Sequence, residues 1–356
     1  MNNYFINQIV AIDIFLVSTI AVLSFIVIVY VLLIESSARK RNKGLINIKK
    51  NVYEMVLSGA KLSANTCAPF AEASTPQQFL DIAMNRDSVF FNEREQEAFK
   101  TCFKASDNMK RIEDAALKAR NKWRRIEAIL SLSYLDSKNA PNILNRSLSS
   151  KDADIRYFSV MALGQMKNSQ SSRILVDMIK NGGFSRRKLV SILESFPPDT
   201  TSEHAIPLLK NTDTDVRFWT LKLLSQLGPG KHLNEITDLT KDPSEEIRSA
   251  ACECLGNYGN KAASNTLTDA LQDESWLVRS AGVKALSELL GDGCISKIMG
   301  LLGDNSLSVL SAVKDALVAH IDAAMPYIEK VYSDGDRMAK MICVEAVEEA
   351  GKGKAK

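Results

Sequence analysis

The chain has 356 residues, with 45 Lys and Arg against 42 Asp and Glu, which gives a formal net charge of +3. A hydrophobic content of 46% with 24% charged residues excludes a disordered chain and a polytopic membrane protein. The near balance of charge lacks the basic excess of a nucleic-acid-binding protein, so we expect no nucleic-acid partner. Only three histidines are present, which leaves little material for metal or general-base chemistry, and we expect no cofactor.

The first 50 residues predict a membrane anchor. Residues 14–34 form a run of 21 residues without a charged side chain. As a helix this run spans roughly 30 Å, the thickness of a bilayer core. Residues 1–13 contain no Lys or Arg, so the basic start of a cleavable signal peptide is missing and the anchor is expected to be retained.

A cluster of basic residues follows the apolar run, in the segment 35–50: Arg39, Lys40, Arg41, Lys43, Lys49 and Lys50. Basic residues accumulate on the cytoplasmic side of a span. We therefore expect a single-pass protein of the bacterial inner membrane, with residues 1–13 as an extracytoplasmic tail and the rest in the cytoplasm. The cluster is either a topology signal alone or also a contact to anionic lipid.

A second pattern recurs with a period of about 31 residues. The stretches 152–164, 213–225, 245–256 and 275–287 share an acidic turn, a β-branched residue, an arginine and an apolar helix. Aligning the chain on that arginine gives spacings of 31, 31, 30, 31 and 31 residues between Arg125, Arg156, Arg187, Arg217, Arg248 and Arg279. The same register continues to Leu310 and Lys340, so about eight units cover residues 118–351.

The columns of this alignment predict a helix with one buried face. The residue seven positions after the arginine is apolar in most units, and the residue three positions after it is usually small. Residues of this kind at this spacing mark one face of a helix. Each unit also contains a shorter helix before the acidic turn. Neither helix can bury its apolar face alone, so we expect the units to stack into a solenoid.

The acidic turn followed by the pattern V-R-x-x-A-x-x-A-L-G resembles the HEAT-repeat family, and most closely its short-period PBS-lyase HEAT-like repeats. The resemblance covers about two thirds of the chain. It implies an all-α fold, here one transmembrane helix followed by a cytoplasmic HEAT-type α-solenoid of about eight helical-hairpin repeats. The unit of Arg187 departs from the pattern, because Glu194 stands where Leu is expected and Pro197 and Pro198 follow. We expect this unit to be distorted or to mark a bend.

Two further segments complete the predicted organisation. Residues 51–117 are expected to form a helical adaptor that caps the N-terminal end of the repeats, and residues 352–356 form a short basic tail. The six cysteines all follow the span and show no C-x-x-C pairing. In a cytoplasmic domain they are expected to be free thiols: Cys67, Cys102, Cys252, Cys254, Cys294 and Cys343.

The recurring polar residues are interpreted as structural. We expect the arginines to pair with neighbouring turn acids and helix ends, and the acidic residues to cap second helices. The residues given this role are Arg125, Arg156, Arg187, Arg217, Arg248, Arg279, Asp152, Asp213, Asp242, Asp273 and Asp304. An anion-binding groove lined by the arginines, and a metal site at the two D-x-D sequences, are the alternatives.

Four residues of the second helices are candidates for a partner-binding surface: Tyr157, Phe218, Lys222 and Lys284. If second helices line the concave side, as the resemblance implies, these side chains point into the groove. No catalytic, cofactor-binding or metal residue is assigned. The resemblance includes di-iron hydroxylases whose metal is held by paired His-Glu steps, and this sequence has no His-Glu dipeptide. We therefore expect a protein that is not an enzyme.

The combined features predict a membrane-anchored cytoplasmic scaffold or accessory subunit. It would bind one or more membrane-associated protein partners, for example within a polysaccharide-synthesis complex, which is suggested by resemblance alone. Tethering raises the effective concentration for such partners. A lyase-like HEAT-repeat enzyme and a membrane-surface lipid binder are the two alternatives.

Overall fold

The computed structural model describes residues 35–36, 100–101, 108–135, 137–228 and 232–354. Within these ranges the regular structure consists of α-helices and short 3-10 helices, and no strand occurs. The predicted all-α helical repeat fold is therefore confirmed. The chain divides into two compact units, Met1–Ala162 and Leu163–Lys356, and the boundary between them falls inside one helix.

The first unit contains two helical pairs in its described part. Their bounds are α5 Asn108–Lys118, α6 Lys122–Tyr134, α7 Ala140–Leu148 and α8 Ala153–Met166, the last of which continues into the second unit. The first pair begins at Asn108, whereas the repeats were predicted to begin at residue 118. The difference arises because α5 lies before the aligned arginine and has no acidic turn after it to mark it as part of a repeat.

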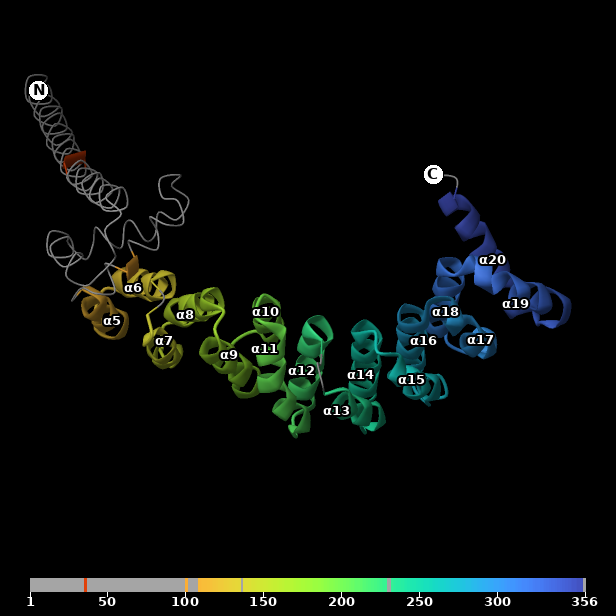
Figure 1. Ribbon diagram of the computed structural model, residues 1–356, viewed down its shortest axis with the longest axis horizontal. Helices are drawn as coiled ribbons and strands as arrows, with labels where there is room; N and C mark the ends of the chain where they lie inside the picture. The colour runs from red at the N-terminus through yellow and green to blue at the C-terminus, as the bar shows by residue number, and fades with distance from the viewer. Residues whose placement is uncertain (1–34, 37–99, 102–107, 136, 229–231, 355–356) are drawn as a thin grey trace, which may run out of the picture. The chain divides into compact units, whose positions relative to one another are not determined.

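In its described part the second unit continues with six helical pairs, labelled in Figure 1. Their first helices are α9 Ser169–Asn181, α11 Pro198–Ala205, α13 Leu233–Asp238, α15 Ser264–Ala270, α17 Ile295–Ile298 and α19 Ile321–Asp334. Their second helices are α10 Arg186–Leu193, α12 Thr214–Leu227, α14 Glu245–Tyr258, α16 Trp276–Leu290, α18 Leu307–Ala319 and α20 Arg337–Lys354. Short 3-10 helices extend several first helices: η1 Ile206–Lys210, η2 Leu239–Lys241, η3 Lys261–Ala263, η4 Gly291–Cys294 and η5 Met299–Gly303.

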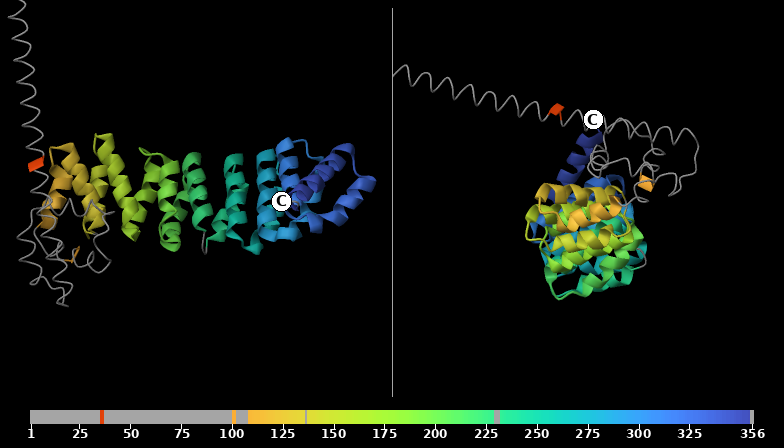
Figure 2. Two further views of the ribbon diagram at one scale, coloured as in Figure 1. Left: turned by 90° about the horizontal axis from the view of Figure 1, so that it is seen from above. Right: turned by 90° about the vertical axis from the view of Figure 1, so that its left-hand side faces the viewer.

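The second helices of this unit form a continuous row. Helix α12 packs on α14, α14 on α16, α16 on α18 and α18 on α20, and Figure 2 shows these helical pairs following one another side by side. Polar residues in the turns start these helices: the Asp213 carboxylate accepts a hydrogen bond from the Asp215 N–H, and the Ser275 hydroxyl accepts one from the Leu277 N–H. We call the outward surface of this row the second-helix face.

The predicted core columns are buried. The residues seven positions after the aligned arginine are fully buried at Leu132, Leu163, Leu224, Leu255, Leu286 and Leu317. The small residues three positions after it are buried as well, and where they are polar they are satisfied within the helix. The Ser159 hydroxyl donates to the Ile155 carbonyl and the Thr220 hydroxyl to the Val216 carbonyl, both at 2.7 Å.

The unit that was aligned on Arg187 follows the same pattern when the register is moved by one residue. Counting from Arg186 places Leu193 in the seventh position, and Leu193 is 0% exposed, whereas Glu194 is exposed beyond the end of α10. The core of this unit is therefore regular. Its second helix is short, with eight residues, because the chain turns at Pro197 and Pro198 starts α11.

Several predicted segments lie outside the described residues. They are the tail 1–13, the apolar run 14–34, the basic residues at 39, 40, 41, 43, 49 and 50, and most of the adaptor 51–117, with Cys67 and Cys102. Of the helices that are described, none combines the length and the apolar composition needed to cross a bilayer.

Helices α14 and α16 approach each other closely because Gly256 lies at their contact. A β-carbon added at Gly256 would lie 2.7 Å from both Cα and Cβ of Ala285. The contact at Cα involves main chain, which moves only together with its helix. The absence of a side chain at residue 256 therefore sets the distance between these two helices.

We predict that Gly256→Ala destabilises the protein. An alanine inside a helix gains about 1 kcal/mol over glycine, but forcing the extra carbon into this contact costs about 1–3 kcal/mol or more, so the clash should win. Gly351→Ala in α20 is the matched control, because no atom lies within 4 Å of its added β-carbon. Urea unfolding followed by circular dichroism measures both variants, and equal midpoints for the two would contradict the predicted close contact.

Candidate functional site

The aligned arginines hold the turn that precedes their own helix. In four repeats the guanidinium Nη1 donates to two carbonyl oxygens five and six residues earlier, at 2.8–3.3 Å: Arg156, Arg217, Arg248 and Arg279. These carbonyls belong to the loop between the two helices of a repeat and would otherwise lack partners there. The recurrence of arginine follows from this need for a planar group with several donors.

Three of these arginines also reach the next repeat, twenty-five residues on. Arg248 binds Asp273 through Nε at 2.8 Å and Nη2 at 2.9 Å, and Arg279 binds Asp304 through the same atoms at 2.7 and 2.9 Å. Arg217 binds Asp242 with one bond of 3.0 Å, and its buried Nε has no hydrogen-bond partner in the described part of the chain. We call these three pairs the arginine–aspartate ladder.

Each aspartate of the ladder also accepts a backbone hydrogen bond at the start of the helix that follows it. Asp242, Asp273 and Asp304 accept the backbone N–H of the serine two residues later, at 2.8–2.9 Å. The carboxylate therefore joins the guanidinium of one repeat to the first turn of the next. Both partners are largely buried at the last pair, where the Arg279 side chain is 17% exposed and the Asp304 side chain 6%. This burial makes the pairs stronger than exposed salt bridges.

The hydrogen bonds of the ladder shift the pKa values of two of its pairs, Arg248–Asp273 and Arg279–Asp304. The hydrogen bond from Arg279 lowers the pKa of Asp304 below its ordinary value, against an opposing effect of burial. Burial alone would raise the pKa of Asp273, but the hydrogen bonds from Arg248 and the Ser275 N–H outweigh it and lower that pKa. The bonded aspartates raise the pKa of Arg248 and Arg279 in turn. The Arg248–Asp273 and Arg279–Asp304 pairs are thus ionised throughout the neutral range.

Asp152 and Asp213 occupy a different position, two residues further along the repeat than the ladder aspartates. Asp152 accepts the Asp154 N–H at 2.9 Å and Asp213 accepts the Asp215 N–H at 3.0 Å. Their D-x-D sequences therefore act as helix caps. Lys122 forms an ion pair with both Asp152 and Asp154. Among the described residues, no group of three or more His, Cys, Asp and Glu side chains is placed to hold a metal ion.

Two of the predicted arginines do not hold the turn before their own helix in the way that Arg156 and the ladder arginines do. The Arg125 Nε donates to the Ala116 carbonyl at 2.8 Å, so this residue holds the end of α5. Arg187 is exposed, and its neighbour Arg186 makes the corresponding contacts: it donates to the Ile179 carbonyl at 2.8 Å and pairs with Asp213 and Asp215. This assignment agrees with the one-residue change of register found in the core.

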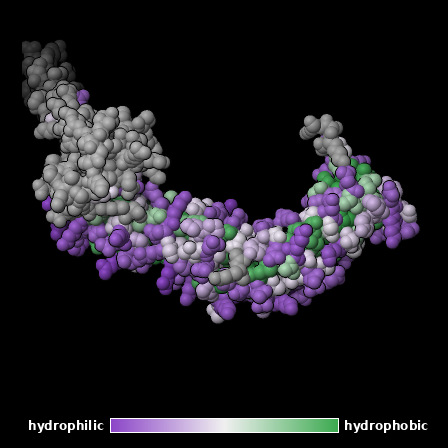
Figure 3. All heavy atoms as spheres, in the orientation of Figure 1, coloured by the Kyte–Doolittle hydropathy of each residue, from purple (hydrophilic) through white to green (hydrophobic). Residues whose placement is uncertain are grey.

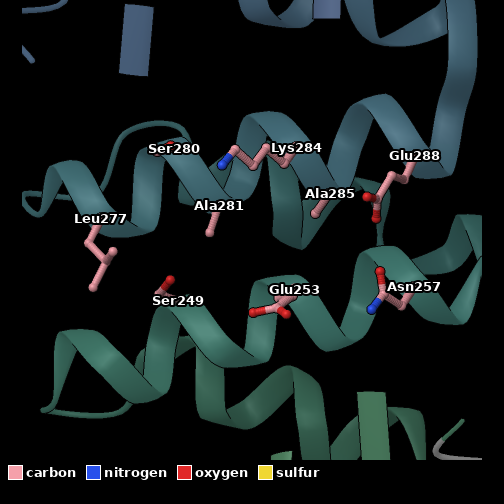
Figure 4. Close-up of a pocket in the computed structure, with 9 residues that line it drawn as sticks. All are labelled: Ser249, Glu253, Asn257, Leu277, Ser280, Ala281, Lys284, Ala285 and Glu288. Carbon is pink, nitrogen blue, oxygen red and sulfur yellow. The ribbon is translucent and has the colours of Figure 1, made fainter. Parts of the chain in front are cut away.

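A polar cleft of about 450 Å³ lies on the second-helix face between α14 and α16. Ser249, Glu253 and Asn257 line it from α14, and Leu277, Lys284 and Glu288 from α16 (Figure 4). The positions from α14 are spaced by four residues, which places them in one stripe along the helix. The cleft therefore follows the groove between two adjacent second helices and is open to solvent.

The charged groups of the cleft are only partly engaged. Glu253 forms an ion pair with Lys222 of α12, and the Asn257 amide donates to the Ser225 hydroxyl at 2.7 Å. Lys284 and Glu288 are exposed and make no hydrogen bond or ion pair with any residue that the structure describes. The cleft thus presents one ammonium and one carboxylate that can accept outside partners.

The four predicted partner-surface residues are placed as follows. The Lys222 ammonium lies 5.6 Å from the centre of the Phe218 ring, so these two form one cluster on α12. Phe218 packs edge-on against Trp219 and is only partly exposed. Lys284 lies on α16 and lines the cleft. Tyr157 belongs to the first unit, where it is exposed and packs edge-on against Phe158.

The structure also brings together three residues that the sequence analysis did not connect. The Ser287 hydroxyl lies 3.1 Å from His320 Nε2, and His320 Nδ1 lies 3.0 Å from an Asp292 oxygen. A neighbouring cleft of about 330 Å³ is lined by His320 and Asp292 but not by Ser287, and the Asp292 side chain is 75% exposed. A molecule in that cleft would not meet the hydroxyl, so the trio is better described as a contact between α16 and the end of α18.

The four described cysteines are free and buried, as expected: Cys252, Cys254, Cys294 and Cys343. Burial raises the pKa of the Cys252 and Cys254 thiols to about 12. A thiol with such a pKa is protonated at neutral pH and is a poor nucleophile. These residues therefore act as small core side chains.

We predict that Asp304→Asn lowers the free energy of unfolding by about 1.5–3 kcal/mol, because hydrogen bonds to a charged group are worth that much. The effect should depend on pH. The folded-state pKa of Asp304 lies below its ordinary value of 3.8, so at acid pH the native state binds fewer protons than the unfolded state. The stabilisation by the ionised Asp304 is therefore complete above the unfolded-state pKa. It is lost as the pH falls from there through the folded-state pKa. Urea unfolding at about pH 6 and about pH 3 measures this dependence. The free energy of unfolding should fall less between these two pH values in the variant than in the unmodified protein.

Asp269→Asn serves as the control, because Asp269 is exposed. If Asp304→Asn lowers the free energy of unfolding no more than Asp269→Asn does, the role of the ladder is contradicted.

No curated protein matches the sequence. The Escherichia coli protein YibA is similar over 72% of this chain and 96% of its own, with 18% identity and a TM-score of 0.39. Human deoxyhypusine hydroxylase is similar over 68% of this chain and 96% of its own, with 16% identity and a TM-score of 0.29. An archaeal HEAT-like repeats protein from Thermococcus onnurineus is similar over 60% of this chain and 97% of its own, with 15% identity and a TM-score of 0.37.

A family model described as HEAT repeats matches residues 109–194, 202–287 and 232–318. These matches together cover more than half of the chain and coincide with the helical pairs from α5 to α18. The chain belongs to the HEAT-repeat family.

Proposed function

We propose that the protein is a scaffold that binds a protein partner on the second-helix face. A HEAT-repeat fold suggests a protein-interaction scaffold, since a stacked array presents an extended surface. The observation that carries the proposal for this face is the cleft between α14 and α16, where Lys284 and Glu288 have no partner among the described residues. A partner segment with an acidic and a basic side chain would form an ion pair with each of these two residues.

The charge pattern along the face supports a polar and specific contact. The position five residues after the aligned arginine carries Lys222, Glu253, Lys284 and Asp315 in successive repeats, so the sign alternates from helix to helix. A single exposed ion pair contributes about 0–1 kcal/mol. Affinity would therefore come from several such contacts together, and the alternation would select partners of complementary pattern.

Membrane tethering is the second part of the proposal. It rests on the uncharged run 14–34 and on the basic residues after it. The anchor would leave the repeats in the cytoplasm of a bacterial cell, next to membrane-associated partners such as the subunits of a polysaccharide-synthesis complex. A modest intrinsic affinity would then suffice, because the tether raises the effective concentration.

A lyase-like enzyme is the alternative function, and a deep groove with converging ionisable groups would favour it. The α14–α16 cleft is open and contains no histidine or cysteine, and one of its carboxylates is engaged by Lys222. These features support a binding surface more than a reaction site, and we propose that the protein is not an enzyme.

Site-specific photocrosslinking in native membranes tests the scaffold. We predict that a photoreactive residue at position 284 captures the same protein partner repeatedly, whereas one at position 297 does not. Lys297 is the matched control, since it is an exposed lysine on the first helix α17. Lys284→Glu should weaken co-purification of that partner about tenfold, which corresponds to 1.4 kcal/mol. Equal capture from both positions, or of the protein itself alone, would contradict the assigned face.

Fractionation tests the tether. We predict that the full chain stays in the membrane pellet after alkaline washing and that removal of residues 1–34 releases it. The chain without residues 1–34 also tests lipid contact. If it binds anionic liposomes in a salt-sensitive manner, and if this binding is lost when Arg39, Lys40 and Arg41 are replaced by Gln, the basic cluster also contacts lipid. A full chain that is washed from the membrane by alkali would rule out the anchor.

A further inference from the structure

Helix α20 presents a stripe of four residues on the side away from the core. Its inward residues are buried, among them Ala339, Ile342, Cys343 and Ala346. On the opposite side lie Arg337, Met341, Val344 and Glu348, at positions i, i+4, i+7 and i+11. This spacing forms one line along a helix. We call these four residues the α20 stripe.

The corresponding positions in earlier repeats are covered by the repeat that follows. In α16 the position of Met341 is Ser280, which is buried and hydrogen-bonds to the Ser308 carbonyl at the start of α18. The position of Val344 is Val283, which is fully buried. The position of Glu348 is Ser287, whose hydroxyl contacts His320 at the end of α18. The α20 stripe is therefore the surface on which another helical pair would stack.

No helix follows α20 among the described residues, and of the two apolar residues of the stripe Met341 is exposed and Val344 half-buried. Met341 is 49% exposed, and Val347 is 38% exposed although the equivalent leucines of other repeats are fully buried. In Figure 3 apolar side chains gather on the visible surface over α18 and α20. Repeat arrays end in polar caps when they are soluble on their own, so an open apolar stripe at this position indicates an interaction surface.

The order of residues in the stripe identifies the partner. Read along the helix it is Arg, Met, Val, Glu. An antiparallel copy of the same helix places Glu348 opposite Arg337 and Val344 opposite Met341, and the two-fold axis repeats both contacts. Arg337 and Glu348 make no ion pair or hydrogen bond through their side chains with residues that the structure describes, so both charges are available. A uniformly acidic or basic partner, or an anionic lipid surface, would satisfy only one of them.

We infer that a second copy of this chain packs on the α20 stripe, giving a homodimer with α20 antiparallel to its equivalent across a two-fold axis. Such an isologous contact needs a surface that is complementary to itself, and the stripe has opposite charges at its two ends and apolar side chains between them. The inference does not depend on the proposed scaffold function, because it concerns a different surface.

Charge reversal tests this pairing in the purified full chain, with sedimentation velocity in detergent as the measurement. The unmodified chain is expected to be a dimer at micromolar concentration. Arg337→Glu and Glu348→Arg each place like charges opposite one another and should raise the dimer dissociation constant about tenfold or more, the equivalent of 1.4 kcal/mol. The double variant restores both pairs and should recover the dimer to within about threefold of the unmodified chain.

Lys330→Glu is the matched control, since Lys330 is an exposed basic residue of the neighbouring α19 outside the stripe. It should leave the dissociation constant unchanged. The exchanged residues are exposed, so the variants are expected to fold. Thermal unfolding followed by far-ultraviolet circular dichroism verifies that each variant is folded. A monomeric unmodified chain overturns the inference, as does a dimer that the two reversals weaken no more than the control or that the double variant fails to restore.

Discussion

The guanidinium that bridges two turns is the interaction on which the second unit depends. Each ladder arginine closes the loop of its own repeat and binds the carboxylate that starts the next helix. A repeat of two short helices has little core of its own, and its stability comes from the neighbour against which it packs. A buried charge that must remain paired fixes that neighbour's position, because losing one partner leaves the other charge buried without compensation. The ladder thus sets the register between repeats, while the leucine columns supply the apolar contact.

Close helix packing is the second constraint, and it shapes the candidate binding surface. Gly256 allows α14 to approach the main chain of α16, and the cleft lies on the outward side of the same contact, next to Ala285. The small side chains at the contact leave room above them, whereas the longer Lys284, Glu253 and Glu288 rise along the rims (Figure 4). The surface that a partner would meet is therefore a consequence of how the core permits the helices to meet.

Much of this architecture could be predicted from the sequence because the residues that recur with the repeat period each have a defined structural role. The recurring arginine, the leucine seven positions later and the small residue between them are tied to the turn, the core and the helix contact. The misplacement at Arg187 shows the limit of that reasoning. The alignment kept the 31-residue spacing and so selected Arg187, although it is Arg186 that is followed by a leucine at the seventh position. The burial of Leu193 decides that Arg186 is the equivalent residue.

The candidate site was harder to predict than the fold. Lys222 and Lys284 occupy the same position of their repeats, yet one is engaged by Glu253 and the other has no partner among the described residues. Spacing within one helix does not reveal which side chain of the next helix lies opposite. The trio of Ser287, Asp292 and His320 was missed for the same reason, since its members come from two repeats and no local pattern joins them.

The ladder is uneven along the array, and this has a consequence for cooperativity. The column that supplies Asp242, Asp273 and Asp304 holds the neutral Ser150 and Asn211 in earlier repeats, so the coupling between neighbours differs from one interface to the next. In a linear array, a string of strongly coupled repeats melts as a block, and a weakly coupled junction lets one block open while the other persists. The helices from α12 to α18 would behave as such a block. At the junction before α12, Arg186 pairs instead with the more exposed Asp213 and Asp215, and exposed pairs contribute less to stability. Thermal fluctuations would therefore separate the repeats first at this junction.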